Sequence, residues 1–357
     1  MPTNVTPEYK EAKAAFQRAS DPAERLSCLK EMLRTVPKHK GTDHLQADIR
    51  TRIKVLTEEL DTAKRKGGGG GPSLAVRPEG AAQVALIGPP NAGKSSLHAK
   101  LSGSHAEVAP YPRTTRLPMP GMLPYEDIRF QLVDLPPIDA SFMEPWFPNT
   151  LQTADAALLV VDLTSPDCVD DVAAIHERLK DKGISLIPEW PYPIDHDAPP
   201  DAARNDAKKA GNSDEEAEEA LDDPFRVYLP VLLVATKTDL AWDKGEVEVL
   251  KELAGLTCPD MAVSVESGEG LDQIGKHLFR GLGVVRVYTK VPGRPPETNA
   301  PYTLFRGDTV SDAARKVHKE LAGSFRFARV WGSGKFDGQQ VGRDHVLGDR
   351  DILELHT

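Results

Sequence analysis

Residues 88–95 read GPPNAGKS, a loop bounded by glycines that ends in a lysine and a serine. Glycine lets the backbone approach a phosphate closely, and successive backbone N–H groups in such a loop can surround an anion. The pattern G-x-x-x-x-G-K-S predicts a phosphate-binding loop in which Lys94 contacts the β- and γ-phosphates and the Ser95 hydroxyl binds Mg²⁺. The residues expected to bind the phosphates are Gly88, Asn91, Ala92, Gly93, Lys94, Ser95 and Ser96.

The segments on either side of this loop are those that such a site requires. An apolar run at 84–87 predicts a buried strand, and residues 96–101 predict the first turns of a helix. The N-terminus of that helix would add free N–H groups and a partial positive charge. The alternative is a glycine turn that precedes a helix without binding anything, and the flanking strand and helix count against it.

Two aspartates follow predicted strands further along the chain. Asp134 ends the alternating segment 128–134, where a second carboxylate would complete the Mg²⁺ shell. The motif TKTD at 236–239 follows the apolar run 231–235. The Asp239 carboxylate could accept both the N1–H and the N2 amino group of guanine, a donor pair that adenine lacks. Thr236, Lys237 and Asp239 are therefore candidate base-binding residues, and GTP is favoured over ATP.

A last motif, Ser264-Val265-Glu266, follows a short predicted strand at 262–264. A backbone N–H of Ser264 or Val265 could contact guanine O6. Each of these motifs is weak alone, since a strand-end aspartate is often a cap and T-K-x-D can be a surface turn. Their order along the chain is the one that a guanine-nucleotide-binding domain requires, which predicts a guanine site.

Composition limits the remaining possibilities. The chain has 357 residues and a formal net charge of −10, which argues against a protein that coats nucleic acid through bulk charge. Its cysteines, at positions 28, 168 and 258, lie far apart and predict free thiols in a cytoplasmic protein. No apolar run reaches the length of a bilayer span, so no membrane association is expected.

Changes of pattern divide the chain into segments. Residues 1–66 predict a helical hairpin with a mildly basic balance, and the glycine run within 67–78 predicts a flexible linker. Residues 79–282 alternate strands and helices, which predicts an α/β domain with a mostly parallel sheet. Within it, residues 188–224 carry twelve acidic and three basic residues and predict a mobile acidic insertion. Residues 283–357 predict a small β-grasp domain of mildly basic balance.

The sequence resembles the Obg/DRG group of GTPases, and most closely the developmentally regulated GTP-binding proteins. The resemblance rests on GPPNAGKSSL, YPRTTRLPMPG, QLVDLP, TKTD and SVESGEG, and on the basic helix that ends in a glycine run. The C-terminal segment, with RVYTKVPGRPPET and VGRDHVLGDRDILEL, is similar to a TGS domain. The resemblance covers nearly all of the chain except 188–224, where the family has a folded insertion.

The resemblance implies roles for the two switch segments. One of Thr114 and Thr115 should contact Mg²⁺ and the γ-phosphate, and the sequence leaves open which of them does so. Asn91 matches the position where the family holds a K⁺ ion that assists hydrolysis, although it could equally stabilise the loop. Pro137 replaces a glycine whose N–H normally contacts the γ-phosphate, and proline has no N–H. Ile138 stands where many GTPases place a glutamine that orients water.

Three functions remain open from the sequence. The first is a slow GTPase switch that acts on the ribosome or translation, docking through the N-terminal helices and the TGS domain. The second is a nucleotide-binding scaffold with impaired hydrolysis, which Pro137 favours. The third is an ATPase of the related TGS-bearing kind, which Asp239 opposes. The sequence gives no oligomeric state. A basic patch in the tail could face RNA or could be an ordinary solvated surface, and it consists of Arg326, Arg329, Lys335 and Arg343.

Overall fold

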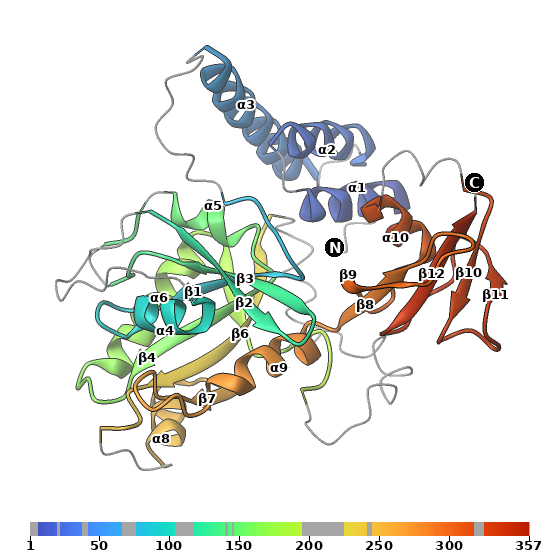
Figure 1. Ribbon diagram of the computed structural model, residues 1–357. Helices are drawn as coiled ribbons and strands as arrows, with labels where there is room; N and C mark the ends of the chain where they lie inside the picture. The colour runs from blue at the N-terminus through green and yellow to red at the C-terminus, as the bar shows by residue number, and fades with distance from the viewer. Residues whose placement is uncertain are drawn as a thin grey trace.

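The computed structural model places three units along the chain: a set of N-terminal helices, a large central sheet with its helices, and a smaller C-terminal sheet (Figure 1). The structure describes residues 6–19, 22–37, 42–65, 76–103, 117–139, 142–144, 146–194, 225–240, 245–317 and 325–356.

The N-terminal unit contains three helices, α1 (Pro7–Arg18), α2 (Pro22–Thr35) and α3 (Asp43–Arg65). The Thr6 hydroxyl caps α1 by accepting a hydrogen bond from the Tyr9 N–H at 3.2 Å, and proline occupies the first position of the helix. Helix α2 packs against both α1 and α3. The predicted helical hairpin is formed by α2 and α3, and α1 packs against α2.

The central sheet has seven strands in the order β2-β3-β1-β4-β6-β5, with β7 paired to β6. All of its pairs are parallel except β2–β3, so the mostly parallel sheet predicted from the sequence is confirmed. The strands are β1 (Gln83–Ile87), β2 (Met119–Tyr125), β3 (Ile128–Asp134), β4 (Ala156–Asp162), β5 (Ile184–Ile187), β6 (Val227–Thr236) and β7 (Asp260–Ala262). The helices of this unit are α4 (Lys94–Ser102), α5 (Phe147–Leu151), α6 (Cys168–Asp181), α8 (Gly245–Ala254) and α9 (Leu271–Gly281).

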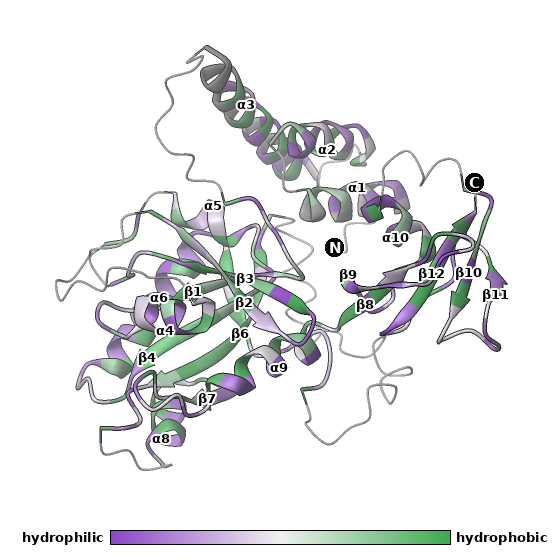
Figure 2. Ribbon diagram, viewed as in Figure 1, coloured by the Kyte–Doolittle hydropathy of each residue, from purple (hydrophilic) through white to green (hydrophobic). Residues whose placement is uncertain are grey.

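Both faces of this sheet are covered by apolar packing. Along β1, Val84 and Leu86 lie in one apolar cluster, whereas Ala85 and Ile87 lie in another. Alternate side chains of a strand point to opposite faces, so β1 contributes to two cores. Figure 2 shows that the central strands are largely hydrophobic. Burial on both faces explains why these strands are continuous apolar runs in the sequence.

The first residues of the predicted acidic insertion are packed, which corrects the expectation that the whole segment is mobile. Trp190 is 8% exposed, and its indole N–H donates to the Val231 carbonyl at 3.2 Å. Its ring lies so close to Gly281 that a Cβ there would be 2.4 Å from it. The Tyr192 hydroxyl donates to the Arg306 carbonyl at 2.9 Å. Residues 195–224, with the rest of the acidic segment, lie outside the described residues.

The residue that follows the insertion packs into the N-terminal helices. Phe225 is 7% exposed and meets the Phe16 ring edge-on, with 5.8 Å between the ring centroids. The Arg52 guanidinium of α3 lies 4.0 Å above the Phe225 ring. These contacts attach the helical unit to the beginning of β6.

The C-terminal unit is a five-stranded sheet in the order β11-β10-β12-β8-β9, and α10 belongs to its core. The sequence predicted strands and a helix here, and it missed β11 and the full length of β9. The elements are β8 (Val284–Thr289), β9 (Glu297–Phe305), α10 (Val310–Val317), β10 (Phe327–Trp331), β11 (Gln339–Val341) and β12 (Asp351–His356). In the described part of the chain, no helix is both long and apolar enough to cross a bilayer.

Candidate nucleotide-binding site

The predicted phosphate loop connects the end of β1 to the N-terminus of α4 at the carboxyl edge of the parallel strands. Gly88 has φ 154°, and a Cβ at this position would lie 2.3 Å from the Val160 carbonyl oxygen of β4. Only glycine fits such an approach. Gly93 caps α4 with φ 88°, and the exposed Asn91 has φ 60°. The positive φ angles of Gly88, Asn91 and Gly93 give a tight turn at the N-terminus of α4.

Lys94 folds back over the loop. Its side chain is buried, and its Nζ donates to the carbonyls of Gly88 at 2.9 Å and Pro89 at 2.7 Å. Burial lowers the pKa of Lys94 to about 8, although the negative charge of Asp134 acts in the opposite direction. A buried ammonium group that lies against neutral carbonyls would be stabilised by an anion in the same loop, which fits a polyphosphate.

Ser95 and Asp134 meet beside the loop, as the sequence predicted for two residues of a Mg²⁺ shell. The Ser95 hydroxyl donates to Asp134 Oδ2 at 2.6 Å. Asp134 is 1% exposed, its Oδ1 atom has no hydrogen-bond partner among the described residues, and burial raises its pKa. A buried, incompletely paired carboxylate beside a hydroxyl fits a hard cation.

This pair differs from a dedicated metal centre. The described residues contain no group of three or more His, Cys, Asp or Glu side chains that could hold a metal ion. Mg²⁺ at nucleotide sites is usually bound through one or two protein oxygens together with substrate phosphates and water. The oxygens of Ser95 and Asp134 fit that arrangement, so the ion would require the nucleotide.

The segment after Asp134 is attached to the phosphate loop by its backbone. The Ile138 N–H donates to the Gly88 carbonyl at 3.2 Å, next to Pro137, which has no N–H to donate. The Ile138 side chain is completely buried, in the same apolar cluster as Phe147 and Leu151. Ile138, at the position of the water-orienting glutamine, therefore belongs to the core. The sequence alone did not indicate this burial.

Thr236, the first residue of TKTD, joins this motif to the phosphate loop. Its hydroxyl is buried and lies 2.8 Å from the Ala92 carbonyl and 3.1 Å from the Val161 carbonyl. The Thr236 hydroxyl at the end of β6 therefore connects the TKTD motif to the phosphate loop.

Lys237 is directed toward the end of β4. It has φ 62°, and its Nζ forms an ion pair with Asp162 Oδ2 at 2.5 Å. Asp162 also accepts hydrogen bonds from the backbone N–H and the hydroxyl of Thr164. Sequence reasoning missed Asp162, although its place at the end of an apolar strand was a signal.

Asp239 and Ser264 meet at the predicted base-binding end of the site. The Ser264 hydroxyl donates to Asp239 Oδ1 at 2.7 Å and accepts the Ser267 N–H at 3.1 Å. The sequence suggested a role for the backbone of Ser264 or Val265, and the structure adds that the Ser264 side chain orients the carboxylate. Asp239 is exposed, so a ligand can reach it.

Most of the predicted site residues therefore gather at one edge of the sheet. Gly88 to Ser96 form the loop and the start of α4, Asp134 lies beside Ser95, and the TKTD and SVE motifs follow β6 and β7. Thr114 and Thr115, the first-switch candidates, lie outside the described residues. Their predicted contact with Mg²⁺ stays a prediction.

Two family models match the central and C-terminal parts of the chain, and several known proteins match nearly all of it. The model of the family described as 50S ribosome-binding GTPase matches residues 83–188, and the TGS domain model matches residues 285–357. A protein of Halobacterium salinarum described as an uncharacterized GTP-binding protein is 31% identical, over 93% of this chain and 98% of its own length.

Two further relatives carry more specific names. Developmentally-regulated GTP-binding protein 1 of Xenopus laevis is 29% identical, over 91% of this chain and 96% of its own length. Ribosome-interacting GTPase 1 of Saccharomyces cerevisiae is 27% identical, over 94% of this chain and 99% of its own length. With the site motifs in the required order and a TGS domain after them, the chain belongs to the Obg/DRG group of GTP-binding proteins.

Proposed function

We propose that the protein binds GTP and GDP in the loop at residues 88–95 together with Mg²⁺, and that it hydrolyses GTP slowly as a molecular switch. The observation that carries this proposal is the position of the Thr236 hydroxyl, 2.8 Å from the Ala92 carbonyl. This contact connects TKTD to the phosphate loop. The phosphate end and the base end would thereby be parts of one site.

At the phosphate end, the side chains already present supply positive charge and metal ligands. The loop N–H groups and the Lys94 ammonium would neutralise the β- and γ-phosphates. The Ser95 hydroxyl and the Asp134 carboxylate would hold Mg²⁺, directly or through water, and one of Thr114 and Thr115 would complete the shell. A bound Mg²⁺ ion supplies charge neutralisation at the bridging and terminal oxygens.

At the base end, the Asp239 carboxylate would accept two hydrogen bonds from guanine. The Ser264 hydroxyl occupies one of its oxygens at 2.7 Å and leaves lone pairs on both, because an ionised carboxylate has about four acceptor sites. Adenine offers no matching pair of donors, so this geometry opposes the ATPase alternative.

Hydrolysis should be slow because the second switch contributes little to water positioning. The Ile138 side chain lies in the core and Pro137 has no N–H, so neither can orient water or contact the γ-phosphate by the usual route. Asn91 lies exposed in the loop and could help to hold a K⁺ ion that substitutes for the missing groups. Catalysis would then depend on positioning and charge neutralisation.

We further propose that the partner is the ribosome, or another RNA, contacted through the N-terminal helices and the TGS domain. One relative is named as a ribosome-interacting GTPase. In the TGS sheet, Ala328 and Val330 of β10 face the core, which places Phe327, Arg329 and Trp331 on the opposite face. Aromatic and cationic side chains on one face of a sheet suit single-stranded RNA, because bases stack on the rings. In this chain Phe327 already stacks on His356 and the Lys290 ammonium lies over Trp331, so a base would extend or replace these contacts.

The four residues of the basic patch expected from the sequence are all exposed, namely Arg326, Arg329, Lys335 and Arg343. The Arg343 Nη2 also donates to the Phe325 carbonyl at 2.9 Å, and its guanidinium lies over the Phe325 ring. Arg343 is therefore held against its own domain, whereas RNA contact by this region would use all four cations.

A second candidate function is a nucleotide-dependent scaffold without turnover. Its specific support is the Pro137–Ile138 segment, whose backbone is held to Gly88 and whose isoleucine is buried. Such an attachment would limit the response of the second switch to a γ-phosphate. Binding of guanine nucleotide without hydrolysis would distinguish this function from the first.

Single-turnover GTP hydrolysis by the full chain, in buffers with K⁺ and with Na⁺ as the only monovalent cation, tests the switch. We expect slow hydrolysis that is faster in K⁺. Nucleotide binding without hydrolysis in both buffers would refute the switch and support the scaffold. Co-sedimentation with ribosomes in GTP and in GDP tests the partner, and equal absence from the ribosomal pellet in both would refute it.

A further inference from the structure

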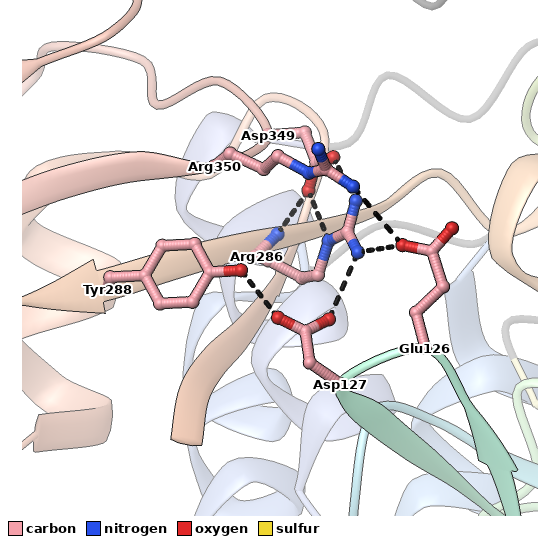
Figure 3. Close-up of polar contacts among 6 residues, drawn as sticks. All are labelled: Glu126, Asp127, Arg286, Tyr288, Asp349 and Arg350. Carbon is pink, nitrogen blue, oxygen red and sulfur yellow. Dashed lines mark hydrogen bonds and ion pairs between the residues drawn. The ribbon is translucent and has the colours of Figure 1, made fainter. Parts of the chain in front are cut away.

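An ionic cluster joins the turn between β2 and β3 to the TGS domain (Figure 3). Arg286 of β8 donates from Nη1 to Glu126 and, at 3.0 Å, to Asp127, the two residues of that turn. The same guanidinium donates from Nη2 to Asp349 at 2.6 Å within the TGS domain. We name this set of residues the interdomain clasp, and its further members are Tyr288, whose hydroxyl donates to Asp127, and Arg350, which contacts Glu126 at 3.3 Å.

The clasp is specific because its central cation is buried. Arg286 is 4% exposed, whereas Glu126 and Asp127 are 46% and 29% exposed. A buried guanidinium requires carboxylate partners, and bidentate pairing such as that with Asp349 fixes its orientation. Asp349 holds Arg286 in place within its own domain, so the remaining donor positions are oriented toward the G-domain turn.

The β2–β3 hairpin connects this clasp directly to the nucleotide site. The antiparallel register pairs Tyr125 with Ile128 beside the clasp and Met119 with Asp134 at the opposite end. Asp134 is the carboxylate that contacts Ser95 beside the phosphate loop. The seven residues of β3 span about 20 Å at the usual rise of a strand. If Asp134 shifted toward a metal ion, the β2–β3 hairpin would therefore shift with it, and the turn of this hairpin contacts Arg286.

Helix α4, which begins in the phosphate loop, packs tightly on this hairpin. A Cβ at Gly121 of β2 would lie 2.5 Å from His98 Nε2 of α4. The absence of a side chain at Gly121 allows the helix and the strand to touch. Because α4 and β2 are in direct contact, a movement of α4 would also move β2.

Helix α9 supplies a second connection, from the base-binding end. The helix follows the SVE motif, and its Gly275 lies so close to Tyr125 of β2 that a Cβ there would be 2.8 Å from the ring. Phe279 of α9 packs on Tyr125, with 5.4 Å between ring centroids, and the Arg286 guanidinium lies 4.9 Å above the Phe279 ring. The phosphate end and the base end of the nucleotide site are therefore both connected to the clasp by direct packing contacts.

We propose that the β2–β3 hairpin couples the nucleotide to the position of the TGS domain, and that Glu126 and Asp127 are its docking residues for that domain. The inference rests on the proposed function, since it requires that GTP and GDP bind at residues 88–95. It adds that the TGS domain is positioned by the nucleotide state. Coupling between two sites is reciprocal, so weakening the clasp must change the relative affinities for GTP and GDP.

The test compares the full chain with the variant Glu126→Ala/Asp127→Ala. Both side chains are partly exposed, and Asp349 still pairs with the buried Arg286 guanidinium, so their truncation leaves the fold intact. Glu248→Ala/Glu252→Ala on α8 is the matched control, because it removes two exposed carboxylates of the same unit away from the clasp. Tyr288→Phe removes one clasp hydrogen bond without a change of charge.

Two quantities are measured in Mg²⁺: the ratio of the affinities for GDP and a non-hydrolysable GTP analogue, and hydrogen exchange of residues 284–289 with each nucleotide. In the native chain and the control, exchange should differ between the nucleotides. In the clasp variant that difference should vanish and the affinity ratio should change by about fivefold or more, a typical allosteric coupling. Tyr288→Phe should give a smaller change in the same direction.

An unchanged affinity ratio in the clasp variant, or equal exchange with both nucleotides in the native chain, would overturn the coupling while leaving nucleotide binding intact. An equal change of the ratio in the control would also overturn it, because the effect would then come from net charge. Failure of the native chain to bind either nucleotide would instead refute the proposed function and, with it, this inference.

Discussion

Replacement of Ile138 by glutamine tests whether the second switch is attached to the core. The side chain is completely buried in an apolar cluster, so the substitution removes about 2–3 kcal/mol of apolar burial and adds about 1–3 kcal/mol for an unpaired amide. We therefore expect the free energy of unfolding to fall by about 3–6 kcal/mol, measured by denaturant titration. Ile138→Val, which loses one methylene, should cost about 1 kcal/mol.

The same variant distinguishes two positions for this side chain. If residue 138 faced the γ-phosphate, a glutamine there could orient water, so Ile138→Gln would raise the rate of GTP turnover with little loss of stability. We expect no rise in turnover per folded molecule, because the side chain is buried in the apolar cluster. A faster variant whose stability stays within about 1 kcal/mol of the native chain would refute the assignment of Ile138 to the core.

Two further substitutions test other parts of the site, and a third tests the buried Asp155, which precedes β4 at the opposite edge of the sheet. Lys94→Ala should keep the fold, since it removes a cation that burial disfavours. It should reduce the nucleotide affinity, measured by calorimetry, about 100-fold or more. An undiminished affinity would mean that the loop does not bind phosphate. Thr236→Val keeps the shape but removes the hydroxyl near Ala92, which should cost about 1–3 kcal/mol of stability and weaken nucleotide binding; a neutral result in both assays would contradict the connecting role. Burial raises the pKa of Asp155 from 3.8 to about 6, so the folded chain binds more protons than the unfolded chain between these values, and stability falls as pH rises through that window. Asp155→Asn can still accept a hydrogen bond from the backbone N–H of Gln83. It should therefore reduce this loss of stability with rising pH and add about 1 kcal/mol to the free energy of unfolding at pH 7. Denaturation profiles identical to those of the native chain would contradict the raised pKa of Asp155.

The sequence was sufficient to predict a mostly parallel central sheet and the motifs that the structure brings to one edge of it. Buried parallel strands are continuous apolar runs, so β1, β4 and part of β6 could be recognised, whereas β3 was predicted from its alternating pattern. The loop at 88–95 requires glycine at defined spacing, which makes it visible in one sequence. By contrast, β2 contains two prolines and was not predicted, because an edge strand tolerates residues that a central strand excludes.

Other features depend on contacts between distant residues, which a single sequence does not encode locally. Arg286 and Glu126 are 160 residues apart, and neither position has a pattern that indicates the other. Trp190 lies in a proline-rich acidic stretch whose composition indicates no core, and it is buried because Gly281 leaves room for its ring. The attachment of Ile138 to the core likewise follows from the path of residues 135–138.

The most direct test of the account is whether Asp239 selects the base. Guanine presents two donors to a carboxylate, whereas xanthine presents one donor and one acceptor, the pattern that complements an amide. Competition of GDP, XDP and ADP against a fluorescent guanine nucleotide should show that the native chain prefers GDP and that Asp239→Asn prefers XDP. An Asp239→Asn variant with the native order of affinities, or a native chain that binds ADP as tightly as GDP, would contradict the assignment of this edge of the sheet as a guanine-nucleotide site.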